Sequence, residues 1–239
     1  FFYIVEQPQV IADPPQNTLN GINYINDSTI VLVLEAPLKD FVYVIGDWNS
    51  WELDPSFKMN KSINGEKYWL EINNLTPNIE YRFQYFVDAE IKIADPYSRK
   101  IISEYDQFIP NSIYPGLISY PNKTTHAVSV VETNKQEYVW KNNNFVKPDN
   151  RDLVIYELLI RDFSFRSDYQ TVIDSLPHLK SLGINAIELM PIIEFDGLLS
   201  WGYAPTYFFA AEKFYGPEES LKALIDSCHS NGIAVIMDI

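Results

Sequence analysis

The sequence has little cysteine, little basic charge and no long hydrophobic run. Cys228 is the only cysteine among 239 residues, which excludes an internal disulfide and any metal site built from several cysteines. Acidic residues outnumber basic ones by 32 to 18, so the surface repels polyanions on average, and nucleic acid is not expected as a partner. A neutral substrate is compatible with this charge.

Other features that the sequence lacks narrow the class of protein further. No apolar stretch approaches the roughly 20 residues of a membrane helix, so no membrane span is expected. The opening "FFYIVEQPQVIADPPQ" lacks a basic start and a long apolar core, and we do not expect a signal peptide there. No glycine-rich phosphate loop follows any strand, which argues against a nucleotide or flavin cofactor. The sequence does not determine the cellular compartment, although an extracellular or periplasmic location is favoured over a cytoplasmic one.

Residues 1–121 have the pattern of strands and turns. The β-branched or aromatic runs are "STIVLVLEAP", "FVYVIGDW", "KYWLEINNL" and "EYRFQYFVD", with turn material between them. Strands that recur without a helical period predict an antiparallel all-β sandwich. Residues 122–150 are polar and weakly patterned, and we expect a connector there with one or two strands of its own.

Residues 151–239 follow a different pattern. The runs "LVIYELLIRDF", "INAIELMPI" and "IAVIMDI" predict strands. The segments between them predict helices, one interrupted at Pro177 and ending at Gly183, the other running from Pro217 to Gly232. This order requires a parallel sheet with crossover helices. Active sites lie at the carboxyl ends of such strands, where Asp238 stands. Capping of the next loop is an equal alternative for this carboxylate.

Four motifs together carry a resemblance. They are "LVIYELLIRDFS", "LKSLGINAIELMPIIEF", "SWGYAPTYFFAAEKFYG" and "CHSNGIAVIMDI", and the chain resembles the α-amylase family of glycoside hydrolases (family thirteen) in their order and spacing. "VYVIGDWNSWE", "LTPNIEYRFQYFVD" and "IADPYS" resemble the sandwich that precedes the barrel in branching enzymes, isoamylases and pullulanases, a relative of carbohydrate-binding modules. The resemblance implies an immunoglobulin-like sandwich at 1–121 and the first three strands of a TIM barrel at 151–239.

The resemblance also implies a function. The family contains retaining enzymes that act on starch or glycogen, so the substrate and partner expected here is an α-glucan. In the family the third barrel strand ends in an Asp-x-x-x-Asn-His motif, and Asp238 matches its first position. The catalytic Asp, Glu and Asp of the family, and its usual calcium ligands, lie beyond this point. We therefore expect no catalytic residue and no metal site in this chain, and no hydrolysis by the 239 residues alone.

Tyr203, Asp238 and Trp201 form the predicted substrate-binding set. Tyr203 in "WGYAP" matches a family tyrosine that stacks on the sugar at the cleaved bond, and a flat aromatic face suits the apolar side of a pyranose ring. Ala204 departs from the Asp or Asn that family members often carry there. Trp201 could line the same cleft, although packing is the favoured interpretation.

Several secondary positions are interpreted as structural. Cys228 and His229 are adjacent, so on a helix they point about 100° apart, and both are expected to pack. Glu188 lies in a buried-strand pattern and needs a partner, for which Arg161 is the candidate. The aromatic residues of the first half belong either to a sugar platform or to the core, and alternation does not separate the two.

Two further alternatives stay open. The chain could belong to a non-catalytic glucan-binding or surface-assembly protein, or to a glucan-branching transglycosylase. Three parallel strands leave an open edge and an uncovered apolar face. We therefore expect residues 153–239 to be covered by the remainder of a longer barrel or by self-association.

Overall fold

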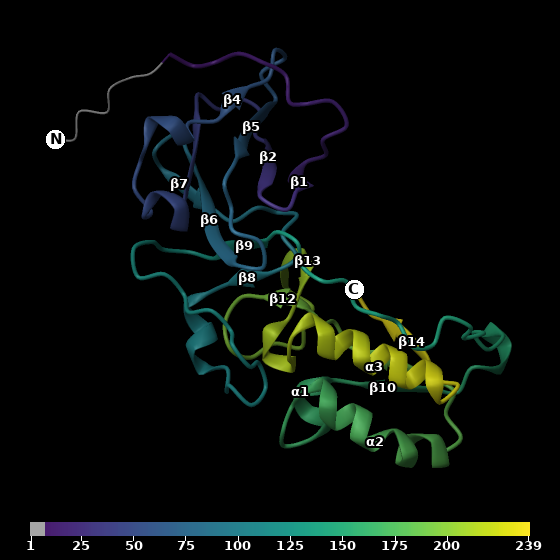
Figure 1. Cartoon of the computed structure of the whole chain (residues 1–239). Helices are drawn as coiled ribbons and strands as arrows, with labels where there is room; N and C mark the ends of the chain where they lie inside the picture. Colours follow the sequence, from purple (N-terminus) through teal and green to yellow (C-terminus); the bar gives the residue numbers. More distant parts are fainter. Residues whose placement is uncertain (1–7) are drawn as a thin grey trace. The chain divides into compact units, whose positions relative to one another are not determined.

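The computed structural model describes residues 8–239 and divides into two compact units (Figure 1). Phe1–Glu104 and Ile118–Gln136 form the first unit, and Tyr105–Leu117 and Glu137–Ile239 form the second. Residues 1–7, part of the stretch for which no signal peptide is expected, lie outside the described residues. Between residues 8 and 239, no helix is long and apolar enough to cross a membrane.

The first unit is built from two antiparallel sheets. Their orders are β1-β2-β5-β4 and β3-β6-β9-β8, and β7 pairs with β6. All four predicted runs form strands, namely β2, β3, β5 and β6. The strands are β1 Gly21–Asn26, β2 Thr29–Glu35, β3 Val42–Gly46, β4 Asn60–Lys61, β5 Lys67–Ile72, β6 Glu80–Val87, β7 Ile91–Ile93, β8 Ile101–Ile102 and β9 Val128–Glu132; the 3-10 turns are η1 Asp47–Asn49 and η2 Pro55–Phe57.

One hydrophobic core joins the two sheets of this unit. It contains Leu32 of β2 and Tyr68 of β5 from one sheet, and Val44 of β3 and Phe83 of β6 from the other. The sheets therefore pack face to face through the side chains that alternate inward. The polar stretch 122–150 supplies β9, which lies between β6 and β8.

The second unit holds a three-stranded parallel sheet in the order β10-β11-β14. This confirms the parallel arrangement that the strand–helix alternation predicts. Its elements are β10 Ile155–Leu158, α1 Ile160–Phe163, α2 Tyr169–Ser181, β11 Ala186–Leu189, β12 Ile193–Phe195, β13 Pro205–Ala211, α3 Glu218–Ser230 and β14 Ala234–Met237, with the 3-10 turns η4 Asn150–Asp152 and η5 Lys213–Tyr215; η3, Glu104–Phe108, begins at the last residue of the first unit.

The helices largely match their expected bounds. α2 continues through Pro177 to Ser181 as one helix, so the interruption expected there does not end it. The first predicted strand run is shorter than expected, because its second half turns into α1. A uniformly apolar run carries no period, and periodicity therefore could not separate the strand from the helical turn.

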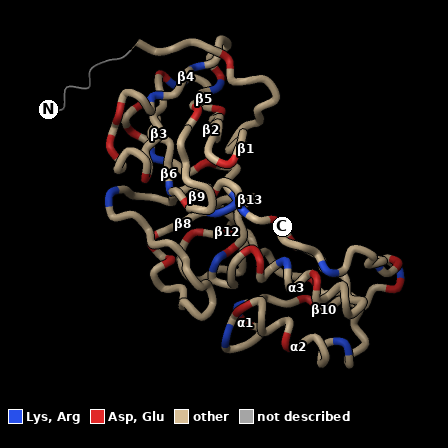
Figure 2. Tube along the Cα trace, viewed as in Figure 1, with Lys and Arg blue, Asp and Glu red and all other residues tan. Residues whose placement is uncertain are grey.

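α2 and α3 cover one face of the parallel sheet. Leu176 of α2 and Leu224 of α3 belong to one core with Leu189 of β11. Cys228 is fully buried in this core, and the His229 ring stacks on Phe145 with centroids 4.1 Å apart. The packing roles predicted for both residues are confirmed. Acidic and basic residues are interspersed along the trace of each unit (Figure 2).

Candidate functional site

Asp238 stands at the carboxyl end of the parallel sheet. It directly follows β14, and its N–H donates to the Leu189 carbonyl at 3.0 Å. Pairing with β11 therefore continues one residue beyond the strand, which fixes the backbone of Asp238. The carboxylate belongs to the end of the sheet at which parallel α/β folds place ligands.

Tyr203 and Asp238 are brought together by the fold. The Tyr203 hydroxyl donates to Oδ2 of Asp238 at 2.8 Å, although 35 residues separate them. This bond is the main cause of the raised pKa of Tyr203, followed by burial of the hydroxyl and by the negative charges of Asp238, Glu157 and Glu188. The tyrosine remains 53% exposed, so its ring is accessible to a ligand.

Trp201 lies on the same loop, two residues before Tyr203. It is 63% exposed, so it does not pack in the core of the unit, contrary to the favoured interpretation. The structure thus pairs Tyr203 with Asp238 through a hydrogen bond and places Trp201 beside them in the chain.

The loop that carries Tyr203 is held by a hydrogen bond from α1 and passes close to the backbone of Pro191. Nη1 of Arg161 donates to the Ser200 carbonyl at 2.9 Å. Gly202 has φ +91°, and a Cβ there would lie 2.3 Å from the Pro191 carbonyl oxygen, so only glycine fits. The proposed Arg161–Glu188 pair was wrong. Arg161 lies in the α1 turn, where its guanidinium pairs instead with Asp162 at 2.7 and 2.8 Å.

Two further carboxylates lie on the face of the sheet opposite α2 and α3. Glu157 and Glu188 are register partners on β10 and β11, and they alternate with residues that pack under the helices. With Asp238 they make this end of the sheet rich in hydrogen-bond acceptors, which suits a ligand carrying hydroxyl donors. Within residues 8–239, no group of three His, Cys, Asp or Glu side chains could hold a metal ion.

A buried polar cluster lies at the base of the same loop. Lys213 in η5 forms an ion pair with Glu194 in β12, and its Nζ lies 3.5 Å from Oδ1 of Asp106. Glu212 accepts the N–H of Phe214 at 3.0 Å. All four charged residues are buried. The ion pair therefore links β12, which precedes the Tyr203 loop, to η5, which follows β13.

Three carboxylates face one ammonium in this cluster. Burial raises the pKa of Glu194 to about 8 although Lys213 opposes the shift, and burial likewise raises the pKa of Glu212. Burial alone would lower the pKa of Lys213, but the surrounding carboxylates raise it. The excess of carboxylates over the single ammonium favours the protonated form of a carboxyl group in this cluster. In the described structure, Oε2 of Glu194 is buried without a hydrogen-bond partner.

Four aromatic residues of the first unit make contacts within that unit. Trp48 stacks on Phe83 with ring centroids 5.6 Å apart, and Tyr85 is fully buried. The indole N–H groups of Trp51 and Trp69 donate to acceptors within the unit at 3.1 and 2.7 Å. Trp48 and Tyr85 therefore belong to the packing of the unit. Trp51 and Trp69 are anchored but partly exposed, and for them the sugar platform stays a prediction.

Sequence reasoning missed Glu157, the Arg161 anchor and the buried cluster. Glu157 had a usable signal, because "IYEL" and "AIEL" place their glutamates at the same position of neighbouring strands. The cluster had none, because residues 106, 194 and 213 meet only in the folded chain.

Residues 122–239 match the family model described as alpha amylase, catalytic domain. The chain belongs to the α-amylase family. This confirms the resemblance carried by the four motifs of the second half.

Two curated proteins are similar in sequence to this chain. The malto-oligosyltrehalose trehalohydrolase of Saccharolobus solfataricus is 34% identical over 158 residues, covering 66% of this chain and 24% of the relative. The 1,4-alpha-glucan branching enzyme GlgB of Clostridium perfringens is 29% identical over 219 residues, covering 85% of this chain and 30% of the relative. The chain thus spans less than a third of the length of either relative.

A solved structure shares the fold of this α-amylase family chain. The Group B Streptococcus pullulanase SAP, in complex with maltotetraose, superimposes with a TM-score of 0.69 at 22% identity, covering 94% of this chain and 33% of that chain. At this identity the likeness is one of fold.

Proposed function

We propose that the chain is part of a longer, retaining glycoside hydrolase that acts on the α-glucosidic bonds of starch, glycogen or their oligosaccharides. The match of residues 122–239 to the catalytic domain supports this, as do relatives named for malto-oligosaccharides and glucans. In this proposal residues 1–121 are an immunoglobulin-like sandwich related to carbohydrate-binding modules. Residues 122–150 are the connector, and 151–239 provide the first three strands of a (β/α)8 barrel.

The observation that carries the proposal is the Tyr203–Asp238 hydrogen bond at the carboxyl end of the parallel strands. The bond orients an exposed aromatic ring beside an acceptor, so that a pyranose can stack on the ring while its hydroxyls reach a carboxylate. Glu157 and Glu188 offer further acceptors on the same sheet. Trp201 extends the aromatic surface in our proposal.

A retaining mechanism needs two carboxylates about 5 Å apart on either side of the anomeric carbon. The family resemblance assigns neither of them to residues 1–239. We therefore propose that Tyr203 and Asp238 bind and position the sugar, and that the 239-residue chain alone does not hydrolyse glucan. Release of reducing sugar from soluble starch by the purified chain would contradict this.

The test of the proposal uses the chain together with the sequence that follows Ile239 in its gene. Reducing-sugar release is measured on starch, glycogen and pullulan for the wild type and for three variants. Tyr203→Ala should lower kcat/KM at least tenfold, about 1.4 kcal/mol of transition-state binding, and Asp238→Asn should also lower it. The matched Tyr203→Phe keeps the ring and should retain most of the activity. Equal activity of Tyr203→Ala and the wild type would refute the site.

A glucan-branching transglycosylase is the second candidate, because the branching-enzyme relative covers more of this chain than the trehalohydrolase does. The two reactions leave different products. Hydrolysis creates reducing ends in proportion to the bonds cleaved, whereas transfer rearranges chains without a net gain of reducing ends. Measurement of reducing ends and chain-length distribution after incubation with amylose therefore separates them.

A further inference from the structure

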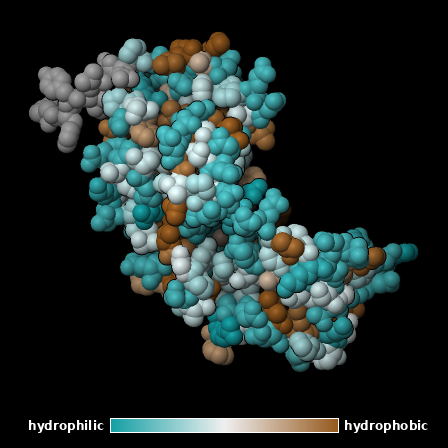
Figure 3. All heavy atoms as spheres, viewed as in Figure 1, coloured by the Kyte–Doolittle hydropathy of each residue, from teal (hydrophilic) through white to brown (hydrophobic). Residues whose placement is uncertain are grey.

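A groove of about 300 Å³ lies between α2 and α3, and it shares no residue with the Tyr203–Asp238 site. Its apolar wall comes from Ile173 and Leu176 of α2 and Ala223 of α3, and its polar rim includes Tyr138 and Asn231. The volume is at the lower end of the range for small-molecule sites. In Figure 3 hydrophobic atoms lie between the two helices with hydrophilic atoms around them.

The sequence opens this groove in two ways. α3 presents the small residues Ala223 and Ser227 to it, which leaves space where larger side chains would fill the gap. Pro177 in α2 has no N–H, so the carbonyl of Ile173 does not receive the helical hydrogen bond from residue 177. Ile173 and Pro177 both line the groove. A helix carbonyl without its usual donor can accept a hydrogen bond from a ligand hydroxyl.

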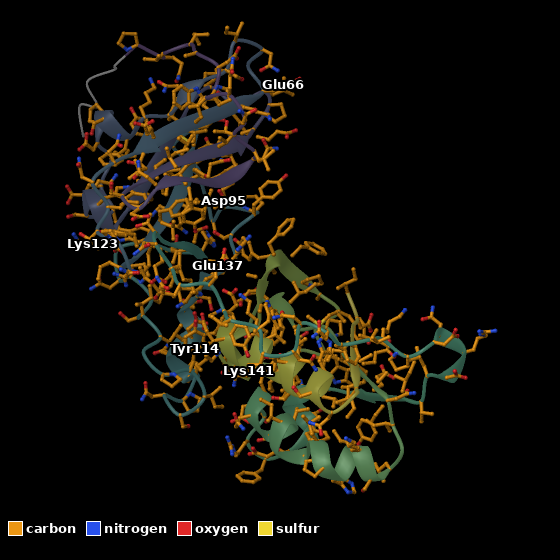
Figure 4. All side chains as sticks on the ribbon, turned by 45° about the vertical axis from the view of Figure 1, so that its right-hand side comes forward. Glu66, Asp95, Tyr114, Lys123, Glu137 and Lys141 are labelled. Atoms are coloured by element: carbon orange, nitrogen blue, oxygen red, sulfur yellow. The ribbon has the colours of Figure 1, made fainter. Side chains whose placement is uncertain are left out.

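Tyr138 lines the groove, and Trp140 packs on Tyr138 next to the lining. Tyr138 and Trp140 make an edge-to-face contact with centroids 5.0 Å apart, and Trp140 remains 38% exposed. Buried Asp226 of α3 fixes this segment, accepting the Tyr138 hydroxyl at 3.1 Å and the Lys141 N–H at 2.8 Å. Figure 4 shows Lys141 beside α3. The Tyr138 ring at the rim is thus held in place before any ligand binds.

The charges of the groove are balanced. Burial alone would raise the pKa of Asp226, but the hydrogen bonds from Lys141, Asn142 and Tyr138 lower it, so the carboxylate is ionised at neutral pH. The ammonium of Lys141 compensates that charge at the rim. An apolar wall, an aromatic ring at the rim, hydroxyl and amide groups and no net charge suit a neutral ring with several hydroxyls.

We propose that this groove binds a glucose unit of an α-glucan, as an accessory site separate from the Tyr203–Asp238 site. The identity of the sugar rests on the proposed function. The inference that the ligand is a ring with several hydroxyl groups rests on the lining of the groove itself. Occupation of this site by one part of a polymer keeps the rest of the polymer at a high effective concentration around the chain.

The test measures maltoheptaose binding to the 239-residue chain by titration calorimetry and by the NMR signal of the Trp140 indole N–H. Ala223→Leu, which fills the groove, and Trp140→Ala, which removes the ring that packs on Tyr138 at the rim, should each weaken binding at least tenfold. The matched control is Val139→Ala, because Val139 is on the same segment and 81% exposed; it should bind as the wild type does. Tyr203→Ala should leave the Trp140 signal responsive to the sugar.

Three results would overturn the accessory site. One is loss of binding in Tyr203→Ala with unchanged binding in Ala223→Leu, which would place the sugar at Tyr203 and leave the proposed function intact. The second is the absence of any maltoheptaose binding by wild-type chain with normal circular dichroism; the proposed function is then still judged from the activity of the longer protein. The third is equal affinity for cellohexaose, which would refute the assignment to α-glucan. Circular dichroism of both groove variants separates loss of binding from loss of fold.

Discussion

The two units differ in their tryptophan side chains, which are partly buried in the first unit and exposed in the second. In the first unit Trp48 and Tyr85 point into the core, and the unit is stabilised by their packing. In the second unit Trp140, Trp201 and Tyr203 are exposed beside polar groups. Exposed aromatic side chains next to hydrogen-bonding groups indicate binding surfaces, whereas a high aromatic content alone does not. The difference predicts that substitution of one of these aromatic residues will lower stability in the first unit and ligand binding in the second. The buried Lys213 cluster is the exception, because it stabilises the second unit.

The largest effect is expected in the buried cluster, where the second unit depends on charge. Lys213→Met leaves Glu194, Glu212 and Asp106 without their ammonium, and we expect the free energy of unfolding of the second unit to fall by about 3–5 kcal/mol. Urea unfolding followed by circular dichroism at pH 7 measures the change.

The matched control for this substitution is Lys222→Met on α3. Lys222 pairs with Glu218 one helical turn earlier, and both side chains are about one-third exposed. Exposed pairs of this kind contribute little, so the change should stay within about 0.5 kcal/mol. Similar losses for the two variants would show that burial does not distinguish these ion pairs.

A smaller loss is expected from Trp48→Ala in the first unit. Trp48 contacts the rings of Phe57, Tyr81 and Phe83, so truncation opens a cavity and should cost about 3 kcal/mol. Trp201→Ala removes the same side chain from an exposed loop and should change stability by about 0.5 kcal/mol or less. Thermal and urea unfolding of both variants test this difference between a partly buried and an exposed tryptophan. Equal losses in the free energy of unfolding would contradict it.

Much of the scaffold could be predicted because its signals are local. Strand runs such as the one forming β2 and the helix that ends near Gly183 are determined by neighbouring residues. The Tyr203 and Asp238 positions came from family motifs, and their hydrogen bond agrees with a shared location. The sequence did not indicate the bond itself, because it depends on how a loop folds back over the sheet.

The features that the sequence did not predict depend on residues that lie far apart in the chain. The β12–β13 pair was not predicted because β12 has only three residues and its register shifts at Glu194. Burial of Lys213 contradicts the usual exposure of lysine, and only the positions of Glu194 and Asp106 explain it. Arg161 was paired with Glu188 because it was placed on a strand rather than in the α1 turn.

Glu194 should make the stability of the second unit depend on pH. Its pKa is about 8 in the folded state against 4.5 ordinarily, so between these values the folded state binds more protons than the unfolded state. The free energy of unfolding then falls as pH rises through this window. The raised pKa of Lys213 adds no slope there, because lysine is protonated in both states below pH 9.

Glu194→Gln removes the titrating group but keeps an oxygen that can accept from Lys213. Its stability should change less than that of the wild type between pH 6 and 9, as measured by urea unfolding at intervals across that range. The remaining slope, to which Glu212 contributes, is common to both proteins. Parallel curves for the two would mean that Glu194 does not retain its proton.

The smallest effect concerns the Tyr203–Asp238 pair, which distinguishes the exposed aromatic residues of the second unit from those of the first. The Asp238 carboxylate raises the pKa of Tyr203 chiefly by accepting its hydroxyl, so Asp238→Asn should lower that pKa toward its ordinary value without destabilising the fold. Tyrosine labelled with ¹³C at Cζ reports the titration by NMR above pH 9. Glu188→Gln is the control, because Glu188 acts on Tyr203 through its charge and as the smallest of the causes, and it should shift the titration less. A Tyr203 pKa unaffected by Asp238→Asn would mean that the hydrogen bond is not formed in solution, and the proposed sugar platform would lose the contact that orients it.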